Sequence, residues 1–116
     1  MSNQELRSQE RAKTNDVPVA RLIGFEAKDI AAGRAAVVLA ARPQHANPMG
    51  TLHGGIPCDI ADAAMGIAFA STLAQEESFT TVELKINFFR PVRQARLKPE
   101  GKVCSGAAGS GMWSAQ

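Results

Sequence analysis

The segment 47–66, NPMGTLHGGIPCDIADAAMG, brings an amide, a histidine, adjacent glycines and two carboxylates to the start of an apolar stretch. Gly54 and Gly55 stand where residues begin to recur at helical spacing, and a helix N-terminus offers unpaired N–H groups with a partial positive charge. Because glycine has no Cβ, a ligand can approach this backbone closely. An anion, or a carbonyl oxygen that becomes one, is the natural ligand of such a site. The two glycines could equally serve only the turn from loop to helix.

Two carboxylates follow in the same helix. Asp62 stands about two turns from its start, between Ala61 and Ala63. A carboxylate among apolar neighbours must be paired, hydrogen-bonded or held for chemistry, so Asp62 is a candidate for chemistry, with a solvated helix face as the less favoured alternative. Asp59 lies nearer the helix N-terminus, where an acid suits the dipole, and we expect it on a solvated face.

Other reactive side chains near the glycines have two interpretations each. His53 could carry a proton or fix the helix entrance by hydrogen bonds, and we favour the second role. Asn47 could hold the loop or a substrate carbonyl. Cys58 fits a small core residue better than a nucleophile. The two cysteines and two histidines make no disulfide framework and no metal-ligand pattern, so we expect no metal and no cofactor.

The elements that must position these residues follow from periodicity. Helical spacing runs from about 54–56 to about 73, with Pro57 tolerable only in the first turn. This helix is apolar on nearly every side, which predicts burial. Strands are predicted near 22–28 and 34–41 with a turn at 31–33, then a loop at 42–49. The segment 80–92, TTVELKINFFRPV, alternates like a long half-buried strand, and RLKPEGKV begins another. A sheet wrapped around one central helix, an α+β domain, is the expected architecture.

Composition narrows the function classes. The 116 residues suggest one domain, and 45% hydrophobic with 21% charged residues is ordinary for a globular protein. A net charge of +2 is too small to imply nucleic-acid binding. No apolar run is long enough to span a membrane, and the polar residues 1–16 show no signal peptide. We therefore expect a cytoplasmic protein with a flexible arm or short exposed helix at 1–16, and no membrane or nucleic-acid partner.

The helix entrance resembles a motif of hot-dog-fold acyl-CoA thioesterases of the phenylacetate-pathway (PaaI-like) type, N-x-x-G-x-x-H-G-G-x(6)-D. The residues that carry this resemblance are Asn47, Gly50, His53, Gly54, Gly55 and Asp62. The segment 80–92 resembles the long strand that follows the helix in the same family. The resemblance covers about residues 17–103.

The resemblance implies a hot-dog fold, with an antiparallel sheet wrapped around one long helix and subunits paired edge to edge as homodimers or homotetramers. It implies the Gly54 N–H as oxyanion donor, and Asp62 of a second subunit as base on water or as nucleophile. Asn47 and His53 would position the thioester and the entry loop, and Thr81 would help to orient the attacking water. The implied reaction converts a small or aromatic acyl-CoA into the free acid and coenzyme A.

The sequence allows more than one role for the residues that could bind substrate, and more than one function. Arg90 and Arg93 could meet the phosphates of coenzyme A, or could lie on a solvated turn. Gly55 would contribute to substrate binding at the helix entrance. A non-catalytic acyl-CoA-binding protein, or an inactive truncated hot-dog protein, is the alternative function. A hot-dog dehydratase would need a catalytic histidine beside an acid on the helix, and His53 stands too early.

The resemblance stops after Val103. Residues 104–116, CSGAAGSGMWSAQ, are small and do not alternate, so they form an atypical tail beside the domain at 17–103. In the neighbouring reading frame, permitted codons give a basic turn and a strand, which suggests truncation or a frameshift, although a natural Gly/Ser-rich terminus is the alternative. We therefore expect incomplete C-terminal strands and an open, unpaired edge near 97–103.

Overall fold

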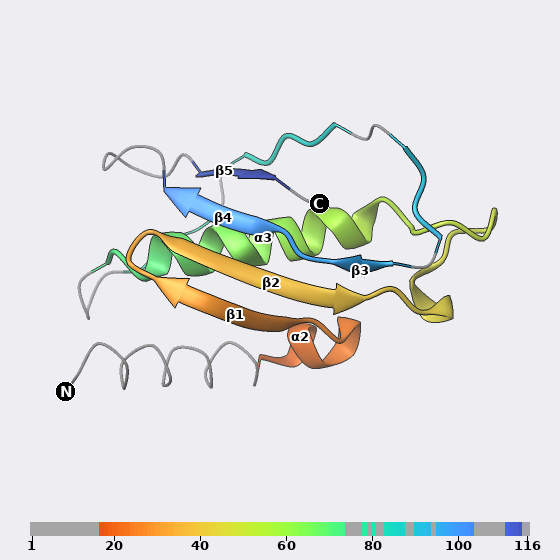
Figure 1. The fold of residues 1–116 in the computed structure, drawn as a ribbon, viewed down its shortest axis with the longest axis horizontal. Helices are drawn as coiled ribbons and strands as arrows, with labels where there is room; N and C mark the ends of the chain where they lie inside the picture. The colour runs from red at the N-terminus through yellow and green to blue at the C-terminus, as the bar shows by residue number, and fades with distance from the viewer. Residues whose placement is uncertain are drawn as a thin grey trace.

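In a computed structural model of the chain, an antiparallel sheet lies against one long helix, as expected (Figure 1). The structure describes residues 17–73, 78, 80, 83–87, 90–93 and 95–103, and the backbone of 111–114. The predicted arm at 1–16 lies outside the described residues. The elements are α2 (Pro18–Ile23), β1 (Glu26–Ala31), β2 (Arg34–Ala40), the 3-10 helix η1 (Pro43–His45), α3 (Gly55–Ala70), β3 (Arg96–Leu97), β4 (Glu100–Val103) and β5 (Gly111–Ser114).

β2 is the central strand of the described sheet, whose order is β1-β2-β4-β5 with β3 paired to the far end of β2. The hairpin between β1 and β2 is confirmed, and Gly33 supplies the positive φ of 76° that its turn requires. On its other side β2 pairs with β3 and β4, placing Ala35 opposite Gly101. Five consecutive residues of β2 are buried, as suits a strand with neighbours on both sides.

The predicted strand near residues 22–28 is wrong at its start. Residues 18–23 form the short helix α2, and β1 begins only after Gly24. Pro18 occupies the first helical turn, where its missing N–H is not needed. Gly24 ends the helix in the left-handed conformation (φ 96°), and its N–H donates to the Ala20 carbonyl. Proline and glycine thus delimit a helix within a stretch whose apolar content alone suggests a strand.

α3 begins and ends close to its predicted bounds, with Pro57 in the first turn, but it is not buried on every side. The sheet covers one face of the helix (Figure 1), so a single row of side chains is fully enclosed. The buried helical residues are Ile60, Ala61, Ala64 and Ala68, whereas Asp59 and Ala70 are exposed and the others lie in between. Burial on nearly every side, as the apolar composition predicts, would require a cover that the described strands do not provide.

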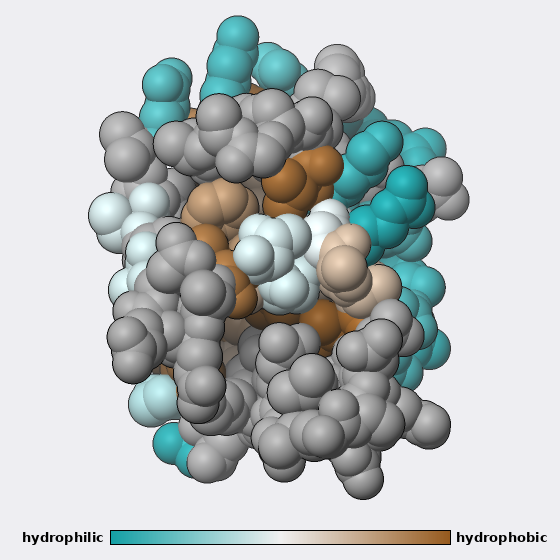
Figure 2. Space-filling view, turned by 90° about the vertical axis from the view of Figure 1, so that its left-hand side faces the viewer, coloured by the Kyte–Doolittle hydropathy of each residue, from teal (hydrophilic) through white to brown (hydrophobic). Residues whose placement is uncertain are grey.

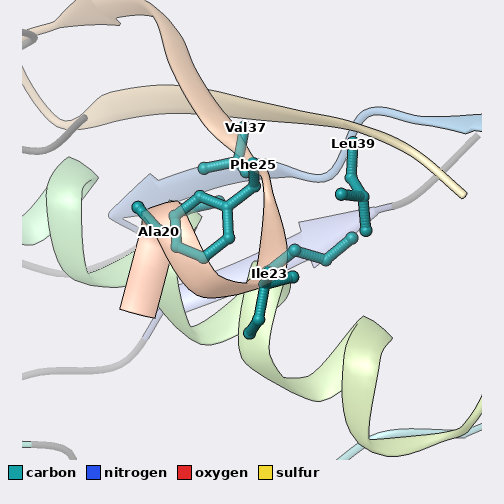
Figure 3. Close-up of a cluster of buried hydrophobic side chains, with 7 residues drawn as sticks. Ala20, Ile23, Phe25, Val37 and Leu39 are labelled. Atoms are coloured by element: carbon teal, nitrogen blue, oxygen red, sulfur yellow. The ribbon is translucent and has the colours of Figure 1, made fainter. Parts of the chain in front are cut away.

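The core lies between the sheet and this buried row. In Figure 3, the side chains of Ala20 and Ile23 from α2 and of Phe25, which precedes β1, gather with those of Val37 and Leu39 of β2. This cluster consists of Ala20, Ile23, Phe25, Val37, Leu39, Ile60 and Ala64. A second cluster toward the β1–β2 turn consists of Ala27, Ile30, Ala35 and Ala68. Viewed from the end that carries this turn, hydrophobic residues surround a paler group at the centre of the face, and strongly hydrophilic residues gather along its right-hand side (Figure 2).

The C-terminal expectations are partly wrong. β4 pairs with β2 on one side and with β5 on the other, Gly101 facing Trp113 across the ladder, so the predicted open edge at 97–103 is covered along β4. Within the predicted long strand at 80–92, the described residues 83–87 belong to no strand or helix. Their side chains nonetheless alternate between exposed and half-buried, which is the predicted period of two.

Candidate functional site

The entrance of α3 leaves one backbone donor available. The Gly55 N–H donates to Nδ1 of His53 (2.9 Å), and the Ile56 N–H donates to the His53 carbonyl (3.0 Å). The next residue, Pro57, has no N–H. Of the first-turn donors, only the Gly54 N–H finds no acceptor within the part of the chain that the structure describes. A ligand oxygen can therefore bind to Gly54 without displacing a protein hydrogen bond.

The direction of this donor is set by one peptide unit. The His53–Gly54 peptide is trans, so its carbonyl and its N–H point in opposite directions. Since the carbonyl is held by the Ile56 N–H inside the first turn, the Gly54 N–H points away from that turn. The second glycine serves the histidine ring: a Cβ on Gly55 would lie 3.1 Å from His53 Nδ1. The His-Gly-Gly sequence thus combines a free donor with a tightly placed ring.

The ring of His53 has a positional role at this entrance. Its Nδ1 accepts the Gly55 N–H, so that nitrogen is not available as a proton acceptor in this arrangement. The His53 backbone N–H donates to the carbonyl of His45 (2.8 Å). These contacts correspond to the favoured interpretation, in which His53 fixes the loop.

Asn47 organises the loop that precedes the helix. Its Oδ1 accepts the N–H groups of Met49 (3.0 Å) and Thr51 (3.1 Å), and its Nδ2 donates to the Thr51 hydroxyl (2.8 Å). The Asn47 backbone N–H also donates to the Thr51 carbonyl (2.7 Å). Between the two roles open to it from sequence, this geometry supports loop holding, with one amide hydrogen left for other contacts. The loop carries Met49 exposed at its tip.

The two helical carboxylates differ in environment as expected. Asp59 is exposed, whereas Asp62 is half-buried among small and apolar helical neighbours. Asp62 follows Gly54 by eight residues, which places its Cα about 12 Å farther along the axis. A carboxylate side chain cannot cover that distance, so the Gly54 donor and the Asp62 of one chain do not meet at one carbonyl carbon.

The remaining predicted residues lie away from the entrance or outside the described part. Arg90 and Arg93 are both exposed, in the segment before β3. Thr81 lies outside the described residues. Among the residues that the structure describes, no group of three or more His, Cys, Asp and Glu side chains is placed to hold a metal ion.

One residue of the site region has no sequence signature. His45 is the one buried polar or charged residue within the described ranges, at 4% exposure. Its ring contacts the backbone of Ile23, which is 22 residues away, and its carbonyl holds the His53 N–H. A single histidine in a polar loop gives no local sign of such a contact. Its position two residues before Asn47 is the only available hint.

Comparison with known proteins gives a consistent result. Residues 49–105 match the family model described as the thioesterase superfamily. A candidate esterase of Saccharolobus solfataricus, SSO2140, is 38% identical over 71 residues, which is 61% of this chain and 50% of that protein. The chain therefore spans about half the length of this curated relative.

Solved structures share the fold. A thioesterase family protein from Silicibacter pomeroyi superposes with a TM-score of 0.77 at 26% identity, over 84% of this chain and 72% of the other. A variant of the phenylacetic acid degradation protein PaaI from Thermus thermophilus gives 0.74 at 22% identity, over 85% and 84%. At that identity the second likeness concerns the fold alone. In the described part of this chain, no helix has both the length and the apolar character needed to cross a membrane.

Proposed function

We propose that this chain hydrolyses an acyl-CoA thioester, because it has the hot-dog fold and its residues 49–105 match the family model of the thioesterase superfamily. The observation that carries the proposal is the Gly54 N–H, a backbone donor at a helix N-terminus that no described group occupies. The oxygen of a thioester carbonyl becomes an oxyanion when its carbon is attacked. A fixed N–H at a helix N-terminus stabilises that charge without reorganising.

The reaction needs an activated water besides the oxyanion donor. The Asp62 carboxylate removes a proton from water as the water oxygen forms its bond to the carbonyl carbon, and the carbonyl oxygen becomes the oxyanion at Gly54. When the oxyanion collapses, the carbon–sulfur bond breaks and the departing sulfur takes the proton from Asp62. The products are a carboxylic acid and the coenzyme A thiol. Direct attack by Asp62 on the carbonyl carbon, followed by hydrolysis of the anhydride, is the second route with the same residues.

Two copies of the chain complete this site in the proposal. The separation of about 12 Å between Gly54 and Asp62 along one helix supports a partner chain as the source of the carboxylate. We therefore place the active site between subunits of a homodimer or a homotetramer, with Gly54 from one subunit and Asp62 from the other.

The substrate is a small or aromatic acyl group on coenzyme A. Arg90 and Arg93 are exposed cations three residues apart, and we assign them to the coenzyme A phosphates. Gly55, beside the ring of His53, contributes to binding of the substrate next to its thioester group. Thr81 is assigned to orientation of the attacking water.

The test of this function is a panel of acyl-CoA substrates assayed with a thiol reagent. Asp62→Asn keeps the side-chain size and removes the base, so kcat should fall by about a hundredfold or more. Asp59→Asn is the matched control, because Asp59 lies on the same helix, also carries a carboxylate and is exposed. It should keep kcat near that of the parent. Equal activity of the parent and Asp62→Asn would refute the assignment, and tight acyl-CoA binding without turnover would favour the non-catalytic alternative.

The shared site has its own test. Gly54→Pro removes the N–H, and the φ of −59° at Gly54 matches the angle that proline requires. Coexpression of an Asp62→Asn chain with a Gly54→Pro chain creates mixed dimers in which one of the two sites has both functional groups. Random pairing should restore about a quarter of the parental activity. Inactive mixed dimers, from parents that are each folded, would contradict a site shared between subunits.

A further inference from the structure

His45 has two ring contacts that specify one form of the ring. Nδ1 accepts the N–H of Arg42 (3.0 Å), and Nε2 lies 2.7 Å from the carbonyl oxygen of Ile23. A backbone N–H can only donate and a carbonyl oxygen can only accept. The ring is therefore the neutral tautomer with its hydrogen on Nε2, and both nitrogens are satisfied in a buried position.

These contacts join three segments that are distant in sequence. Ile23 is the last residue of α2, Arg42 follows β2, and the backbone carbonyl of His45 accepts the N–H of His53 at the entrance of α3 (2.8 Å). The contact with α2 connects His45 to the hydrophobic core, because Ile23 itself is part of the main hydrophobic cluster (Figure 3). Residue 45 is thus fixed to the core by its ring, and it holds the helix entrance by its backbone.

The chain of contacts ends at the proposed oxyanion donor. The Ile56 N–H holds the His53 carbonyl and so restrains the plane of the His53–Gly54 peptide. His45 holds the preceding peptide plane through the His53 N–H, so the Cα of His53 that joins the two planes is also fixed. The Gly54 N–H belongs to the His53–Gly54 plane. Resting on the proposed thioesterase function, we infer that His45 is a positioning residue, whose neutral ring anchors the oxyanion donor to the hydrophobic core.

Two conservative variants separate the ring contacts. In His45→Gln the side-chain amide nitrogen can replace Nε2 and donate to Ile23, while the acceptor for Arg42 is lost. In His45→Asn the side-chain oxygen can replace Nδ1 and accept from Arg42, while the link to α2 is lost. Because only the Ile23 contact reaches the core, kcat should fall about tenfold to a hundredfold in His45→Asn. His45→Gln should lose less, and KM should change little in both.

Ser71→Ala is the control for a merely structural effect. Ser71 fastens the opposite end of α3 to the β1–β2 hairpin, where its hydroxyl accepts the Gly33 N–H (2.8 Å). Its loss should lower the melting temperature and leave kcat unchanged at a temperature where the protein is folded. Full kcat in folded His45→Asn, or equal kcat losses in His45→Asn and Ser71→Ala, would overturn the inference.

Amide hydrogen exchange tests the same contact without catalysis. In folded His45→Asn the His53 and Ile56 amides should exchange faster than in the parent, and in His45→Gln, which keeps the Ile23 contact, the increase should be smaller, whereas Ser71→Ala should leave both unchanged. Unchanged exchange in folded His45 variants would overturn the inference. An inactive parent would refute the proposed thioesterase function, and the exchange result would still decide whether His45 positions the helix entrance.

Discussion

Gly101 is the point where the sheet comes closest to α3, and replacing it with alanine should be costly. A Cβ on this residue would lie 2.5 Å from the carbonyl carbon of Ala64 and 2.7 Å from the nitrogen of Met65. Both are backbone atoms in the middle of a helix, so neither can turn aside as a flexible side chain would. The strand β4 and the helix must separate instead.

The size of the effect follows from that separation. An ordinary contact needs about 3.4 Å or more, so β4 must withdraw by about 1 Å, and a gap of that order loses a quarter to a half of the dispersion energy across it. The contacts affected are those of the buried helical residues Ala61, Ala64 and Ala68. We expect Gly101→Ala to lower the free energy of unfolding by about 3 kcal/mol, at the upper end of overpacking costs. In a domain of this size that corresponds to a melting temperature lower by roughly 10–20 °C.

Gly24→Ala provides a matched comparison, measured with Gly101→Ala by thermal and urea unfolding followed by circular dichroism. Gly24 has a φ of 96°, and a Cβ on it would have no atom within 4 Å, so alanine there meets only backbone strain. That strain costs about 1–2 kcal/mol. If Gly101→Ala melts with the parent, or loses no more stability than Gly24→Ala, the close approach of β4 to α3 does not control stability.

Three further predictions use other parts of the chain. Ser71→Ala should lower the free energy of unfolding by about 1–2 kcal/mol, because it leaves the Gly33 N–H without its acceptor; the urea midpoint measures this, with Ser71→Thr as a control that keeps the hydroxyl. Arg90→Gln combined with Arg93→Gln should raise KM for acyl-CoA several-fold at low salt and leave KM unchanged for a thioester without phosphates; an equal rise for both substrates would exclude a phosphate role. Amides in 83–87 should exchange quickly in dilute protein and become protected at every second residue as the oligomer forms, whereas uniform exchange in a proven oligomer would exclude strand pairing there.

The local features of the fold were accessible from sequence wherever residue type alone decides the conformation. The glycine at position 33 and the apolar spacing that begins after Gly54 predict the β1–β2 turn, β2 and α3 close to their observed bounds. α2 was less accessible, since its six residues are too few to display a helical period. In the sequence only Pro18 and Gly24 mark the ends of this helix. That the segment between them is helical becomes clear only from the core cluster that Ile23 joins.

The residues of the candidate site also differ in whether the sequence alone could single them out. Asn47, His53 and Gly54 could be singled out because their chemistry and spacing act within a few residues, and the side-chain hydrogen bonds of Asn47 and His53 are local. His45 could not be, because the acceptor of its ring nitrogen is the carbonyl of Ile23, on an element that the sequence misassigned. A buried histidine of this kind becomes visible only when the framework that surrounds it is known.

The segment 83–87 shows why a correct period does not ensure a strand. Alternation of side chains is a property of one extended segment, and it is present here in the pattern of exposed and half-buried residues. A strand is a property of two segments, because its N–H and C=O groups must bond to those of a neighbour. β4 has a neighbouring strand on each side, and one of these neighbours is β5, residues 111–114, which show no alternating pattern. Such residues can pair because the hydrogen bonds between strands use backbone groups, which every residue except proline carries in full. The described part of this chain offers 83–87 no such neighbour. An apolar half-face is costly to leave in water, and backbone groups that bond only to water are available to another strand. We propose that a second copy of the same segment covers 83–87 through a twofold antiparallel pairing.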